Sequence, residues 1–151
     1  MKKFIKVIDF CLPVVVYIAC SLIAFSLWYI FNQATTPVIS TSIIFAVLGS
    51  VAAGFLTKGK NGKKGMYVAI AAVVVACILW ICVYTYNGSF KEYAAYIATA
   101  FSSYFFNIQT CLSLDTPEYT LYIGYALSLI VPIALILFGR FLRVKILKNK
   151  A

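Results

Sequence analysis

The sequence predicts an all-α, polytopic integral membrane protein with four transmembrane helices and one amphipathic helix between the third and the fourth. Two observations lead to this fold class. Of the 151 residues, 64% are hydrophobic and only 11% are charged, against about 45–50% and about 25% in soluble domains. The apolar residues are also gathered into runs of about 17–25 residues, the length with which a helix crosses a bilayer. A chain this short cannot hide so much apolar surface from water, so the surplus is expected to face lipid.

Four apolar runs are long enough to cross, and together they predict one membrane domain over residues 1–151. Helix-start signals precede two of them: Thr36 with Pro37 offers a capping hydroxyl before proline, and "DTPE" places acids near the positive end of a helix dipole. The expected spans are about residues 10–31, 38–56, 66–86 and 119–138.

The basic residues predict the orientation of the chain. All but one of its 13 Lys and Arg residues lie in three short segments: before the first span, in "TKGKNGKKG" between the second and third, and after the fourth. The exception is Lys91. Because Lys and Arg in short loops favour the cytoplasmic side, both termini are expected in the cytoplasm. The expected location is a bacterial plasma membrane.

Residues 89–108, "SFKEYAAYIATAFSSYFFNI", are the segment whose placement decides this topology. As a helix, residues 90–108 would be about 28 Å long, nearly enough to cross. Crossing would reverse the fourth span and leave its cations outside. Ser89 with Glu92 forms a capping box, and apolar side chains recur every three or four residues. These features favour an amphipathic helix, interfacial or re-entrant, at the outer face. A fifth span and an ordinary loop are the alternatives.

The residues that most catalytic and ion-coupled sites need are scarce. The chain has no histidine and four acidic residues, and no ionisable residue falls inside the four expected spans apart from cysteine and tyrosine. These features disfavour an enzyme, a metal site and a proton-coupled carrier, and no cofactor is expected. The five cysteines contain no C-x-x-C pair and are expected to be apolar fillers. A disulfide-linked dimer through Cys111 is the alternative.

The basic segments indicate which partners the chain meets. "TKGKNGKKG" lacks the spacing of a phosphate-binding loop and the aromatic residues of a nucleic-acid site. We therefore expect contact with anionic lipid headgroups on the cytoplasmic side, and neither a nucleotide nor a nucleic acid as a partner.

Small residues four or three apart predict faces on which helices pack closely in lipid. Packing within one chain is favoured over packing between subunits, because the spans must first pack on one another. The predicted packing residues are Ala46, Ser50 and Gly54 on the second span, Ala69, Ala72 and Ala76 on the third, and Gly124 and Ser128 on the fourth.

Aromatic residues are concentrated toward the expected outer side. A belt that anchors the helices at the interface explains them. The functional alternative is a groove in the outer leaflet, roofed by the 89–108 helix, that receives a lipid tail or a partner's helix. The candidate groove residues are Trp28, Trp80, Tyr84, Phe101, Tyr104, Tyr122 and Tyr125.

Together these features predict a non-enzymatic membrane protein that acts by assembly, as a homo-oligomer or as an accessory subunit of a membrane complex. Its expected partners are membrane lipids and either itself or another membrane protein. The competing hypothesis is transport or lipid or glycolipid translocation through the aromatic groove, or a passive channel. A membrane-embedded transferase that uses a tyrosine or a cysteine is the third class.

Overall fold

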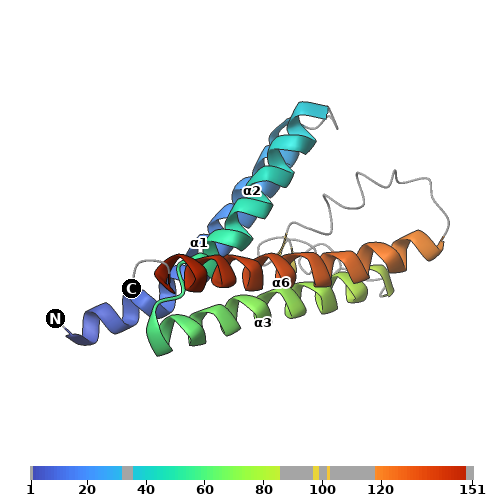
Figure 1. Ribbon diagram of the computed structural model, residues 1–151. Coiled ribbons are helices and arrows are strands. Elements are labelled where there is room, and N and C mark those ends of the chain that lie inside the picture. The colour runs from blue at the N-terminus through green and yellow to red at the C-terminus, as the bar shows by residue number, and fades with distance from the viewer. Residues whose placement is uncertain (1, 32–35, 86–96, 99–101, 103–117, 149–151) are drawn as a thin grey trace.

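A computed structural model describes residues 2–31, 36–85, 97–98, 102 and 118–148, which form four α-helices and no strand (Figure 1). The helices are α1 Lys2–Phe31, α2 Thr36–Phe55, α3 Gly59–Thr85 and α6 Glu118–Lys148. Three of them hold apolar stretches long enough to cross a membrane, namely Phe4–Leu27, Gly59–Val83 and Tyr122–Lys148. The all-α prediction is confirmed for these residues, and the long apolar helices indicate a membrane-embedded protein.

The four helices pack in a ring. α1 lies against α2, α2 against α6, α6 against α3, and α3 against α1, whereas α2 and α3 barely touch although they are consecutive in the chain. Figure 1 shows the α1–α2 pair crossing the α3–α6 pair obliquely. The crossing brings all four helices together near one place, and the largest core cluster lies there.

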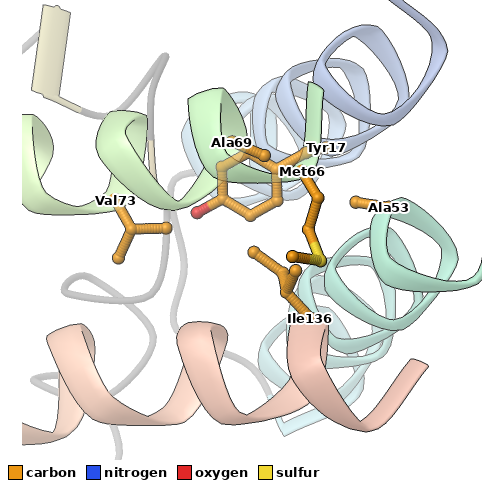
Figure 2. Packing of buried hydrophobic residues seen from close by; sticks show 6 residues of the cluster. All are labelled: Tyr17, Ala53, Met66, Ala69, Val73 and Ile136. Atoms are coloured by element: carbon orange, nitrogen blue, oxygen red, sulfur yellow. The ribbon is translucent and has the colours of Figure 1, made fainter. Parts of the chain in front are cut away.

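That core cluster combines one aromatic ring with small and aliphatic side chains. Every helix contributes at least one member, and no member is more than 1% exposed. Figure 2 shows these side chains converging from the four helices. In lipid such contacts stabilise the fold through close packing rather than removal of surface from water. The members are Tyr17 from α1, Ala53 from α2, Met66, Ala69 and Val73 from α3, and Ile136 from α6.

The connection between α2 and α3 is only three residues long. The backbone N–H of Thr57 donates to the Gly54 carbonyl oxygen at 3.3 Å, and the Thr57 hydroxyl donates to the same oxygen at 2.8 Å. Gly59 then adopts a φ of +60°, a left-handed conformation that glycine takes without a steric penalty. These interactions end α2 and reverse the chain within a very short turn.

The basic segment "TKGKNGKKG" precedes the third expected span but mostly belongs to α3, which begins at Gly59. The last glycine of this segment, Gly65, packs closely against α1 and does not form a turn. A β-carbon on Gly65 would lie 3.1 Å from the Phe10 carbonyl carbon and 3.5 Å from the Phe10 Cα. The backbone of α3 therefore lies directly against that of α1, and Lys60, Lys63 and Lys64 are helical.

Most of the predicted 89–108 helix lies outside the described residues. Within that range the structure describes residues 97–98 and 102. The N–H of Ser102 donates to the Ala98 carbonyl oxygen at 2.9 Å, which is the spacing of an α-helical turn. Ala98 is fully buried beside Trp80 and Val83 of α3.

The start of α1, the α2–α3 turn and the end of α6 lie on one side of the molecule (Figure 1). Two contacts tie these parts together. A β-carbon added to Gly62 would lie 3.5 Å from the Asp9 carbonyl oxygen, so the start of α3 lies close to α1. The Arg143 side chain donates a hydrogen bond to the Phe55 carbonyl oxygen. We call this side the basic end, for the charges described next.

Candidate functional site

The basic end gathers cationic side chains from three helices and one turn. Asp9, whose backbone carbonyl oxygen faces Gly62, is the acidic residue at this end among the described residues. Such an excess of one sign of charge raises the local positive potential and attracts anions. The cations are Lys6 on α1, Lys58 in the turn, Lys60, Lys63 and Lys64 on α3, and Arg140, Arg143, Lys145 and Lys148 on α6.

A pocket of about 370 Å³ lies within the basic end, between the α2–α3 turn and the last turns of α6. We call it the basic pocket. One wall consists of Thr57, Lys58, Gly59 and Lys63, and the other of Arg140, Arg143, Val144 and Leu147. The α6 residues stand at intervals of three and four along the chain, so they form one face of the helix.

Arg143 is held in place at this pocket. Its Nη1 donates a 2.7 Å hydrogen bond to the carbonyl oxygen of Phe55, the last residue of α2. The carbonyls at a helix C-terminus carry partial negative charge and lack partners within the helix. Because a guanidinium has five N–H donors, this bond positions the group and leaves further donors for a ligand.

The chemistry that this arrangement supports is the binding of an anion. Lys58 and Lys63 are exposed, and Arg140 and Arg143 are half-buried. Hydrogen bonds from such cations to phosphate or carboxylate oxygens are stronger than those between neutral groups. Among the described residues, no group of three or more His, Cys, Asp or Glu side chains is placed to hold a metal.

The predicted packing residues of α2 are all buried. Ala46 packs with Ala24 of α1, and the Ser50 hydroxyl donates to the Ala46 carbonyl oxygen at 3.0 Å. Gly54 lies against α6, where a β-carbon would be 2.8 Å from the Ile136 carbonyl carbon and closer still to its oxygen. This face therefore packs within the chain, with Ala46 against α1 and Gly54 against α6.

Gly139 on α6 makes the reciprocal contact. A β-carbon there would lie 2.9 Å from the Val51 carbonyl carbon and 3.1 Å from the Phe55 nitrogen. Gly54 thus accommodates the backbone of α6, and Gly139 accommodates the backbone of α2. The two glycines together set how closely these helices approach.

The predicted packing residues of α3 and α6 are also buried. On α3 they are Ala69, Ala72 and Ala76. On α6, Gly124 is buried, and Ser128 donates to the Tyr125 carbonyl oxygen at 2.9 Å.

The structure describes three of the candidate groove residues. Trp80 is 3% exposed and packs with Val83 and Ala98. Tyr125 packs on this cluster, and its hydroxyl donates to the Trp80 carbonyl oxygen at 3.4 Å. Tyr122 is 69% exposed. Trp80 and Tyr125 therefore pack together, whereas Tyr122 is exposed and does not belong to this cluster. The side chains of the remaining candidates, Trp28, Tyr84, Phe101 and Tyr104, lie outside the described residues.

Several hydroxyl groups and one thiol along the helices bond to the chain's own backbone. Besides Ser50 and Ser128, the Ser42 hydroxyl donates to the Ala24 carbonyl oxygen across the α1–α2 contact at 2.9 Å. The Cys77 thiol approaches the Tyr125 carbonyl oxygen at 3.8 Å. These polar groups take part in holding the fold together.

The sequence did not predict the basic pocket or the contact at Gly139; its cations predicted the orientation of the chain and contact with anionic lipid headgroups. The spacing of Arg140, Arg143, Val144 and Leu147 is a signal for one helix face. It does not reveal that this face meets the α2–α3 turn. Gly139 has Leu135 and Arg143 as its neighbours four residues away, so it shows no small-xxx-small pattern.

Comparisons with known protein families, with curated proteins and with solved structures find no match. The class of protein therefore follows from the fold alone. It is an α-helical, membrane-embedded protein.

Proposed function

We propose that the chain is a four-span membrane protein with both termini in the cytoplasm, and that it acts by assembling with other membrane proteins rather than by catalysis. The 20 residues of α2 correspond to about 30 Å of helix, the thickness of the hydrocarbon core, although its apolar stretch, Ser40–Phe55, is shorter than those of the other three helices. Gathering of the cations at one end supports the orientation, since all three basic segments then share one side of the membrane. On this topology the 89–108 segment stays on the outer side.

The observation that carries the assembly proposal is the contrast between the inside and the outside of the helices. The hydroxyls of Ser42, Ser50 and Ser128 bond to the chain's own carbonyls, so they are engaged in the fold. The outer faces present large apolar side chains on every helix, such as Val15, Leu48, Ile78 and Ile130, each more than half exposed. Surfaces of this kind contact lipid tails or the helices of other proteins.

The partners that fit these surfaces are a second copy of the chain or another membrane protein, together with membrane lipids. A role as a homo-oligomer or accessory subunit follows. Neither a cofactor nor a nucleotide or nucleic acid is part of this proposal, because the absence of histidine and the scarcity of acids disfavour catalytic and metal chemistry.

Native mass in detergent tests the proposal directly. The protein is extracted from its own membranes, and the mass of the purified species is compared with the 16.7 kDa of one chain. We expect a defined oligomer or a stoichiometric complex with a second membrane protein. A lone monomer would instead contradict assembly and favour the translocation hypothesis.

A tryptophan scan of the outer faces locates the contact. Ala19, Leu48, Ala71 and Ala134 are exposed positions, one on each helix. A bulky side chain at any of them leaves the core untouched, so each variant is expected to fold. Disruption of the assembly by one or two of the four variants would identify the interface. If all four variants leave the mass of an oligomer unchanged, these faces do not form it.

A further inference from the structure

We propose that the basic pocket is a binding site for the phosphate group of an anionic membrane phospholipid. This inference uses the proposed placement of the basic end at the cytoplasmic membrane interface. It is independent of whether the chain assembles with copies or partners.

Cations from two separate parts of the chain converge on this pocket. Lys58 and Lys63 line it from the turn and the start of α3, and Arg140 and Arg143 line it from α6. None of its eight lining residues is acidic. Like charges held close together repel one another, and an anion between them relieves this repulsion. The walls of the pocket are mostly apolar, so the cationic groups of these side chains would meet an anion at its mouth.

One of these cationic donors is held beside the pocket by a hydrogen bond. Arg143 is fixed by its 2.7 Å bond to the Phe55 carbonyl oxygen, so its guanidinium loses little freedom when a ligand binds. Arg side chains pair with phosphate oxygens through two parallel hydrogen bonds. Gly59, the first residue of α3, also lines the pocket, and the positive end of that helix dipole adds to the attraction.

The surroundings of the pocket indicate a lipid rather than a soluble phosphate. Exposed apolar side chains alternate with cations along the last turns of α6: Phe141 is 59% exposed, Val144 45% and Leu147 55%. The start of α1 repeats this pattern, with Phe4 70% exposed and Val7 58% exposed. Mixed apolar and cationic surfaces are typical of helix segments at the level of lipid headgroups. The phosphate nearest to the pocket is then that of a lipid.

A pair of charge-matched double variants tests the site. Lys63→Gln with Arg140→Gln removes one pocket cation from α3 and one from α6. The control, Lys64→Gln with Lys145→Gln, also removes one cation from each helix, at positions that do not line the pocket. Arg143 is left intact because it also holds the end of α2. Far-UV circular dichroism and thermal unfolding check that each variant folds, and Lys63→Gln alone, at an exposed side chain, provides a milder second variant.

Native mass spectrometry measures the binding of phosphatidylglycerol to the detergent-solubilised protein, with phosphatidylcholine as the neutral lipid. We expect the wild-type protein and the control variant to retain phosphatidylglycerol preferentially. The pocket variant should bind it at least about tenfold more weakly, the smallest effect expected from losing even one charge-assisted hydrogen bond. Inorganic phosphate is added in a parallel titration. Because the same spectra report the oligomeric state, loss of lipid binding and loss of assembly are distinguished.

Three results would overturn the inference. Equal weakening in the pocket and control variants would mean that binding follows diffuse surface charge. Equal retention of the two lipids would exclude recognition of an anionic headgroup. Displacement of phosphatidylglycerol by inorganic phosphate at comparable concentrations would assign the pocket to a soluble anion.

Discussion

The reciprocal glycine contact between α2 and α6 leads to a quantitative prediction for Gly54→Ala and Gly139→Ala. The new methyl group of Gly54→Ala would lie 2.8 Å from the Ile136 carbonyl carbon and 2.9 Å from the Arg140 nitrogen. These are backbone atoms of α6, which cannot rotate away as a side chain can. The helices must therefore move apart.

The size of the effect follows from that separation. A gap of about 0.5–1 Å removes a quarter to a half of the attraction between the facing atoms, and overpacking costs about 1–3 kcal/mol. Alanine in place of glycine within a helix recovers about 0.5–1 kcal/mol. Each single variant is therefore expected to lose about 1–2 kcal/mol of unfolding free energy. Since one separation relieves both clashes, the double variant should lose less than the sum of the two single losses.

Titration with sodium dodecyl sulfate from a mild detergent, followed by far-UV circular dichroism, measures these unfolding free energies. Ala134→Leu, at an exposed position on α6, adds more atoms without a clash and should change stability by less than about 0.5 kcal/mol. The reciprocal glycine contact is refuted if Gly139→Ala changes the unfolding free energy as little as this control does. It is also refuted if the losses of the two glycine substitutions are fully additive.

Two hydrogen bonds support further predictions. Ser42→Ala removes a 2.9 Å interhelical hydrogen bond and should lower the unfolding free energy by about 0.6 kcal/mol, at most about 1.7 kcal/mol. Ser50→Ala, whose 3.0 Å hydrogen bond lies within α2, should lower it less in the same titration. Equal losses would argue against the interhelical role of Ser42. Arg143→Gln removes the 2.7 Å bond to Phe55 and should cost about 1 kcal/mol with faster amide hydrogen exchange in residues 56–58. Unchanged exchange there, or the same exchange in Lys145→Gln, would show that Arg143 does not hold the end of α2.

The helices of this protein were predictable from the sequence because long apolar runs leave few alternatives to membrane-embedded helices. Their ends were less predictable. α1 begins at Lys2 and α6 continues to Lys148, well beyond the apolar runs that started at residue 10 and stopped at 138. Lys, Arg and Leu favour helix strongly, so a helix continues where hydropathy falls.

The start of α3 shows how tertiary packing changes the meaning of a local pattern. Glycines spaced through a basic segment are typical of a turn, yet Gly65 lies within the helix and against the backbone of Phe10. The small-residue pattern of Ala69, Ala72 and Ala76 in fact extends back to Gly65 at the same spacing, which is a signal for its packing role.

The basic pocket was beyond sequence reasoning for a related physical reason. Its cations come from Lys58 and Lys63 on one side and from Arg140 and Arg143 on the other, almost 80 residues apart in the chain. Their convergence depends on α6 crossing α2 at the glycine contact. The sequence shows an excess of cations in each segment, but only the arrangement of the helices shows that these cations line one pocket.

The orientation of the basic end is the claim on which the proposed function and the lipid site both depend. A single cysteine at Asn61, in a chain whose five native cysteines are replaced by serine, tests it with a thiol reagent that cannot cross membranes. A chain that retains only Cys111 is the matched control, expected to be labelled from outside intact cells. We expect labelling at position 61 only after the membrane is permeabilised. Labelling at position 61 in intact cells would contradict it.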